Sequence, residues 1–236
     1  MNKSLKIQEF SIAIAAKNLN PAAINLDFLK YSGVVPGDWE LVRNPIYTKG
    51  LVQIFFKNGV GIVAQPNQLS FLEVINNKSH QDIQIVQLAN ACVDKLPNMD
   101  YLGASINPKG FVMCESREEA YGFVHNKLLS PGPWMEFGDT PVKAALQFSY
   151  NLEGGQLNLS VNEADAKTPE GKNLSLILFS GSFNRANKGE TVEEKLSNMH
   201  QIINNWMQDM EIYVNLVDQR FLKQSEQVLQ IRDAVI

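Results

Sequence analysis

The sequence predicts an α+β protein in which an internally duplicated β-α-β(3-4)-α unit forms a mostly antiparallel sheet with helices packed on one face. Three observations carry this prediction. Segments with apolar residues at every second position alternate with segments at helical spacing, helix starts are marked by capping residues, and several short segments return in the same order.

Five segments have the two-residue period that is typical of half-buried strands. They are residues 10–14, 52–56, 146–150, 157–161 and 174–178. Asn58-Gly59 predicts a two-residue hairpin turn because both residues tolerate positive φ, and Gly154-Gly155 occupies the same place after the later strand.

Helix starts are expected where a capping side chain is followed by an acid at the third helical position. Ser79 with Asp82, Ser116 with Glu119 and Thr191 with Glu194 fit this pattern, Asn20-Pro21 predicts another start, and a last helix is expected from about Gln219 to the end. Two apolar stripes at helical spacing support helices: Ile85, Leu88, Ala89, Cys92, Leu96; and Leu196, Met199, Ile203, Trp206, Met210.

The duplication is predicted from short segments that recur in order. Pro36-Gly37-Asp38-Trp39 returns as Pro131-Gly132-Pro133-Trp134, and residues 52–56 return as 146–150. Residues 68–71 return as 173–176, with the extra residues in a polar hairpin loop. The chain is therefore divided into a first repeat unit (1–98), a second (99–209) and a C-terminal strand and helix (210–236), with the strand starting at Met210-Glu211-Ile212-Tyr213.

This order of elements resembles the TATA-box-binding protein fold, in which two halves make one curved antiparallel sheet with helices on its convex side. The resemblance is one of topology only. The chain has no sequence motif of that family, so none of the family's DNA-contacting residues is carried over. The chain also resembles an uncharacterised, sporadically distributed bacterial family of similar length, which implies no function.

Composition narrows the classes of partner. The net charge of −4 gives no general attraction to phosphate backbones or anionic lipid, so nucleic acid is an unlikely partner. No apolar run approaches the length of a membrane span, and the short run from Phe10 to Ala16 is too brief for a signal peptide, so a cytoplasmic protein is expected. Cys92 and Cys114 lack metal or redox spacing and are interpreted as ordinary buried thiols.

No catalytic, metal or cofactor site is predicted. His80, His125 and His200 fall in different elements without a nearby second ligand. Residues 59–64 match the letters of a dinucleotide fingerprint but lie in a hairpin rather than between a strand and a helix. The sequence has no GxSxG elbow, and Glu118 and Glu119 sit in a first helical turn, where the helix dipole favours acids.

The strand faces opposite the apolar ones are neutral and polar, with Gln53, Gln147, Asn158 and Ser175 among their residues. Trp39 and Trp134 are interpreted as core plugs between helix and sheet, and the alternative is an aromatic pair lining a cleft between the repeats. These features predict a non-enzymatic interaction or scaffold protein, a subunit of a larger assembly that binds a protein partner or its own copies. The alternatives are a nucleic-acid-associated protein with a saddle-like sheet, and a small-molecule binder or enzyme with a site between the repeats.

Overall fold

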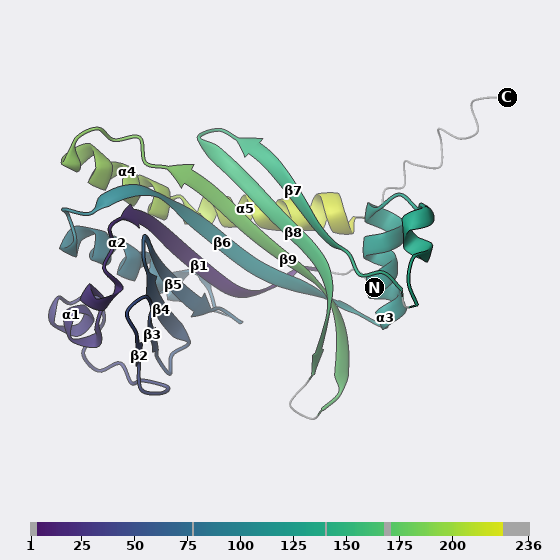
Figure 1. Ribbon diagram of the computed structural model, residues 1–236, viewed down its shortest axis with the longest axis horizontal. Coiled ribbons are helices and arrows are strands. Elements are labelled where there is room, and N and C mark those ends of the chain that lie inside the picture. Colours follow the sequence, from purple (N-terminus) through teal and green to yellow (C-terminus); the bar gives the residue numbers. More distant parts are fainter. Residues whose placement is uncertain (1–3, 77, 140, 168–170, 224–236) are drawn as a thin grey trace.

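A nine-stranded antiparallel sheet dominates the fold. The computed structural model describes residues 4–223 apart from residues 77, 140 and 168–170 (Figure 1). The strands are β1 (Lys6–Lys17), β2 (Ile46–Tyr47), β3 (Val52–Phe55), β4 (Val60–Gln65), β5 (Gln68–Val74), β6 (Asp100–Cys114), β7 (Ala145–Leu152), β8 (Gly155–Lys167) and β9 (Asn173–Ala186). All five predicted strands are confirmed. A turn lies at Asn58-Gly59 as expected, but its loop has three residues rather than two, because Phe56 N donates to Val60 O, and only Gly59 has a positive φ, of +87°.

The strand order is β2-β3-β4-β5-β1-β6-β9-β8-β7, so the long pair β1–β6 lies at the centre. The strands β5, β4 and β3 follow outward from β1, and β9, β8 and β7 follow outward from β6. The element order is thus the same on the two sides of the central pair, except that β2 adds one short strand beyond β3.

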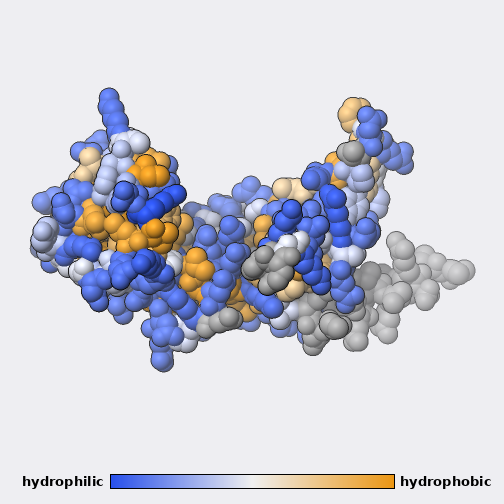
Figure 2. Space-filling view, turned by 90° about the horizontal axis from the view of Figure 1, so that it is seen from below, coloured by the Kyte–Doolittle hydropathy of each residue, from blue (hydrophilic) through white to orange (hydrophobic). Residues whose placement is uncertain are grey.

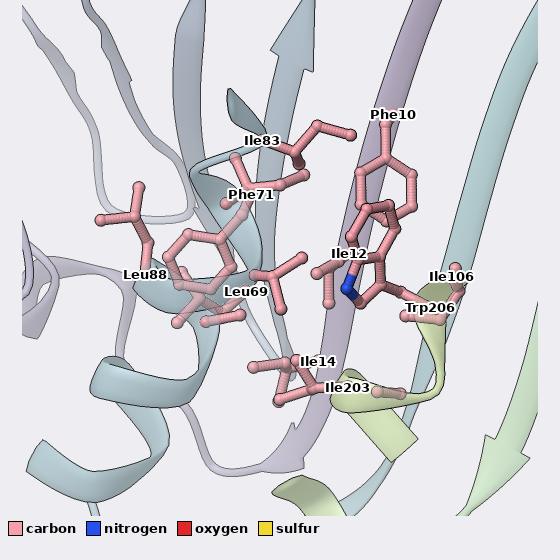
Figure 3. Close-up of a cluster of buried hydrophobic side chains, with 14 of the residues drawn as sticks. Phe10, Ile12, Ile14, Leu69, Phe71, Ile83, Leu88, Ile106, Ile203 and Trp206 are labelled. Carbon is pink, nitrogen blue, oxygen red and sulfur yellow. The ribbon is translucent and has the colours of Figure 1, made fainter. Parts of the chain in front are cut away.

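The longer helices cover one face of the sheet. The helices are α1 (Leu26–Tyr31), α2 (Ile85–Lys95), α3 (Arg117–Gly122), α4 (Val192–Asn204) and α5 (Trp206–Leu216), with short helical turns η1 (Pro21–Ala23), η2 (His80–Asp82), η3 (Phe123–Leu128), η4 (Pro133–Glu136) and η5 (Val217–Leu222). Both predicted apolar stripes point into the core. Figure 3 shows Leu88 of α2 and Ile203 of α4 over the alternate side chains of β1 and β5, with Trp206 beside Phe10 at a centroid distance of 5.4 Å.

Two of the predicted caps open α-helices as expected. The Thr191 side chain accepts from Glu194 N while the Glu194 carboxylate accepts from Thr191 N, which completes a capping box at α4. The Ser116 side chain caps α3 in the same way by accepting from Glu119 N.

The two other predicted starts lead only into 3-10 turns, η1 after Asn20 and η2 after Ser79. The start of α2 is capped instead by Glu73 of β5, whose carboxylate is fully buried and accepts from the N–H groups of Gln84 and Ile85. Lys78 balances this charge, with Nζ 2.7 Å from Oε1 of Glu73. A long-range acid therefore replaces the local cap at this helix.

The strand predicted from Met210 to Tyr213 is wrong, because these residues form the middle of α5. Met210 and Tyr213 are one helical turn apart and both are buried, and the Tyr213 hydroxyl donates to Phe179 O of β9 at 2.8 Å. The helix predicted from Gln219 overlaps η5 and otherwise lies outside the described residues.

Candidate binding face

The sheet face opposite the helices carries a block of mostly uncharged polar side chains on five neighbouring strands, β1, β6, β9, β8 and β7. The registers align Ser11, Asn107, Ser182, Asn158 and Ser149 in one row across β1, β6, β9, β8 and β7. Rows on either side complete the block, which we call the polar face: Glu9, Lys109, Ser180, Ser160, Gln147; and Ala13, Ser105, Asn184, Gln156, Asn151. All of its members except Glu9, Lys109 and Ala13 are Ser, Asn or Gln.

Hydrogen bonds orient several of these side chains. Ser149 donates through Oγ to Oδ1 of Asn158 at 2.7 Å. This bond uses the amide oxygen of Asn158 and not its N–H₂ group. Asn107 donates through Nδ2 to the Ser105 carbonyl at 3.2 Å and to the Ser105 hydroxyl at 3.1 Å. The face therefore presents oriented amides and hydroxyls, which suit a partner that offers both donors and acceptors.

Figure 1 shows that α5 runs behind β7, β8 and β9, so the polar face is turned toward the viewer. Seen from below, this side of the molecule forms a shallow hollow between its two ends (Figure 2). A large partner surface can thus approach several strands at once.

A group of apolar side chains borders the polar face near the start of β9. The registers place Phe111 opposite Leu178 and Met113 opposite Leu176, on the same side as Asn162 and Ala164 of β8. The prediction that Ser175 belongs to the neutral face is therefore wrong. Ser175 lies on the helix side of the strand, because Ile177 and Phe179 rather than Leu174, Leu176 and Leu178 point to the helices.

The structure brings two of the five predicted site residues together. Gln147 and Asn158 are diagonal neighbours on the polar face, in paired strands β7 and β8. Gln53 lies on the same side of the sheet but in β3, near the opposite edge.

The two tryptophans do not lie on the polar face or line a common cleft. Trp39 is half-buried and packs edge-on against Phe56 at 5.1 Å, in the part of the sheet near β3. Trp134 lies in η4, close in sequence to β7, and is 43% exposed, so its interpretation as a core plug is wrong. Phe137, three residues later, is 89% exposed, so this segment presents its aromatic rings to solvent.

The central part of the polar face was missed in the sequence. Its signal was present as a two-residue period in Ser180-Gly181-Ser182 and in Ser105-Ile106-Asn107. What the sequence could not provide was the register between strands that are far apart along the chain, which creates the rows.

Several titratable groups away from this face are buried or held in structural contacts. Arg185 of β9 donates to both carboxylate oxygens of the buried Asp209 of α5 at 2.5 Å, and burial raises the pKa of Asp209 against the opposing effect of Arg185. Burial also raises the pKa of the Cys92 thiol to about 12, so this thiol stays protonated and unreactive.

His200 joins two helices. Its Nδ1 is 2.7 Å from Oδ1 of Asn90 and its Nε2 is 2.9 Å from Oδ1 of Asp94, so it links α4 to α2. Within the described part of the chain, no three His, Cys, Asp or Glu side chains gather in a way that could hold a metal ion.

A shallow groove lies at the other end of the molecule, between the start of α1 and β2. It encloses about 490 Å³ and is lined mainly by apolar atoms, with Leu26, Pro45 and Tyr47 among its residues. The Tyr47 hydroxyl accepts from Leu26 N at 3.2 Å, and Asn25 uses its side chain to cap α1. The polar groups of the groove are thus partly committed to local structure.

No protein-family model matches this chain, and no curated protein matches it. Among the described residues, no helix has the length and apolar character needed to cross a membrane.

Proposed function

We propose that this protein is a non-enzymatic interaction protein, a subunit of a larger assembly, and that it binds an uncharged region of a partner protein on the polar face. The observation that supports this is the three-row block of Ser, Asn and Gln side chains across five strands. Protein interfaces combine many modest hydrogen bonds with apolar contacts, and the group around Phe111 and Met113 adds apolar surface beside the polar rows.

The charges of the face argue for a neutral partner. Glu9 and Lys109 are its only ionised side chains, and the register sets them directly opposite each other, so their fields largely cancel. A phosphate backbone or an acidic peptide would lose its hydration here and meet a single cation, Lys109, whose charge Glu9 offsets. We place this interaction in the cytoplasm.

We also propose that the two halves of the sheet arose by internal duplication of a strand and helix unit. The support is the order of strands outward from the central pair, together with the recurrence of residues 52–56, which include β3, as residues 146–150 of β7. The topology of the TATA-box-binding protein fold would follow from such a duplication, but the polar face lacks the cations that a DNA saddle needs.

A second candidate is a small-molecule binder that uses the groove between α1 and β2. Its volume of about 490 Å³ lies in the range of known ligand sites, roughly 300–1,000 Å³. Its openness to solvent and its committed polar groups make it the weaker candidate.

The proposed function is tested by introducing one lysine side chain on the polar face. Asn158→Lys should abolish co-purification of the partner from native extract, because a charged side chain would have to be desolvated at the centre of the contact. Gln208→Lys is the matched control, since Gln208 is exposed on α5, on the helix side of the sheet.

The expected result is a stoichiometric protein partner with wild type and with Gln208→Lys, and its loss with Asn158→Lys, while the circular dichroism spectra stay the same. A wild-type protein that co-purifies with nothing would overturn the proposal. So would a partner that is retained by Asn158→Lys.

A further inference from the structure

The outer edge of β7 is a long strand edge without the usual protection against pairing. None of its residues, Ala145–Leu152, is charged or a proline. Its register with β8 runs without a bulge. Natural edge strands are normally short, charged, bulged or interrupted by proline. The opposite edge follows this rule, since β2 has only two residues.

The hydrogen-bonding groups on this edge can be assigned from the hairpin. The turn at Glu153-Gly154 has two residues, so the flanking pair Leu152–Gly155 exchanges hydrogen bonds, and every second residue back from Leu152 does the same. The N–H and C=O groups of Ala145, Gln147, Ser149 and Asn151 therefore point away from β8. Among the described residues, no backbone hydrogen bond to these outward groups is formed.

We propose that β7 pairs with β7 of a second copy of this chain, antiparallel and around a twofold axis at Phe148. This register joins Gln147 to the partner's Ser149 and Ala145 to the partner's Asn151, so the outward groups of the two strands satisfy each other.

Charge complementarity selects this register and this occupant. The charged residues nearest to β7 are Lys143, two residues before it, and Glu153, directly after it, and both are exposed. With the axis at Phe148, Lys143 lies opposite the partner's Glu153, and symmetry repeats the pair at the other end of the strand. A self-pairing strand must not repel itself, and the uncharged β7 between two complementary ends meets this condition.

The pairing would also join two polar faces into one continuous surface. The side chains of Gln147, Ser149 and Asn151 lie on the polar face, so the rows of one copy would continue across the axis into those of the other. The inference does not depend on the proposed function, because it requires only the strand edge.

The test measures the dimer dissociation constant of the full chain by sedimentation equilibrium. Lys143→Glu and Glu153→Lys each place like charges opposite one another twice per dimer, and each should raise the constant by about tenfold or more. The double variant Lys143→Glu/Glu153→Lys restores opposite charges and should return the constant to near the wild-type value.

A proline probes the backbone directly. Ser149→Pro removes an outward N–H group but no backbone hydrogen bond to β8, and of the bonds to β8 only the side-chain bond to Asn158 is lost, so the fold should be kept and the dimer lost. Ser182→Lys, on the polar face away from the edge, is the control and should still dimerise.

Wild-type protein that stays monomeric at millimolar concentration would overturn the inference. A dimer that tolerates Ser149→Pro, or single charge variants that the double variant does not rescue, would place the contact elsewhere or in another register.

Discussion

His125 is a fully buried histidine without a hydrogen-bond partner for either ring nitrogen among the described residues. Its ring stacks on Tyr121 with the centroids 3.9 Å apart, and Nε2 lies 3.9 Å from Oε1 of Glu163. Buried polar atoms without partners cost free energy, so His125→Phe, which keeps a stacked ring, should raise the free energy of unfolding by about 1 kcal/mol. Urea denaturation measures this change.

The control for this substitution is His125→Ala, which removes the stacked ring as well and should lower the free energy of unfolding by about 2 kcal/mol or more. If His125→Phe also lowers it, the imidazole makes a favourable interaction with the Glu163 carboxylate that the ring geometry does not reveal.

Residue burial was predictable where a residue lies on a regular stripe. Cys92 fits the apolar stripe of α2, and its side chain is buried as expected. Trp134 has no such stripe, and its burial was inferred from the size of the ring and from its match to Trp39. The Trp134 side chain in η4 is 43% exposed, so ring size and the match to Trp39 together gave the wrong answer.

Asp100, at the start of β6, forms ion pairs with α4 and β1. Its carboxylate is 2.7 Å from Nζ of Lys195 in α4 and 3.5 Å from Nζ of Lys17 in β1. The hydrogen bond from Lys195, followed by the charges of Lys195 and Lys17, lowers the pKa of Asp100 in the folded protein.

A lowered pKa in the folded state means that Asp100 stabilises the fold above its unfolded pKa, about 3.9, and that this contribution is lost as the pH falls below that value. Asp100→Asn should therefore be less stable than wild type at neutral pH and should lose less stability on acidification. Chemical denaturation at a series of pH values measures both effects. Parallel stability curves for the two proteins would contradict this prediction.

Elements were predictable where the signal is local. The capping box at Thr191 lies within four residues, and it opens α4 as expected. The start of α2 depends on Glu73, which reaches the helix from β5 and so leaves no local signal in the helix itself. The inward side of β9 was misjudged for a similar reason, since Leu176 and Ile177 are both buried and only the register with β8 decides between them.

The whole molecule should not bind nucleic acid. It has 21 basic and 25 acidic residues, and Lys109 is the one cation of the polar face. Non-specific DNA affinity of roughly 10⁻⁴ to 10⁻⁶ M arises almost entirely from cations that neutralise phosphates. Titration of labelled duplex or single-stranded oligonucleotide at about 150 mM salt should give no saturable binding below about 10 µM.

A matched variant makes this titration informative. Ser182→Lys combined with Asn158→Lys adds two cations to the polar face and should show weak, salt-sensitive binding if the face is otherwise accessible to DNA. Tight binding by the wild-type protein would show that folding or self-association gathers cations from distant parts of the chain.

The α+β architecture followed from the sequence because five of the strand segments show a two-residue period. The position of β1 in the middle of the sheet could not be predicted in this way. It depends on pairing with β5 on one side and β6 on the other, and no local pattern specifies which strands meet.

That central position of β1 has a consequence for the order in which the chain acquires structure. β1 precedes both of its neighbours in the chain and gains the second of them late, since β5 is complete at Val74 and β6 only at Cys114. Until then one side of β1 has open backbone groups beside a ready-made apolar surface, which is the kind of exposure that leads to aggregation during synthesis. The contacts that close the centre of the sheet are far apart along the chain, so folding should be slow for its size and should depend on chaperones that shield the first half while the second is made.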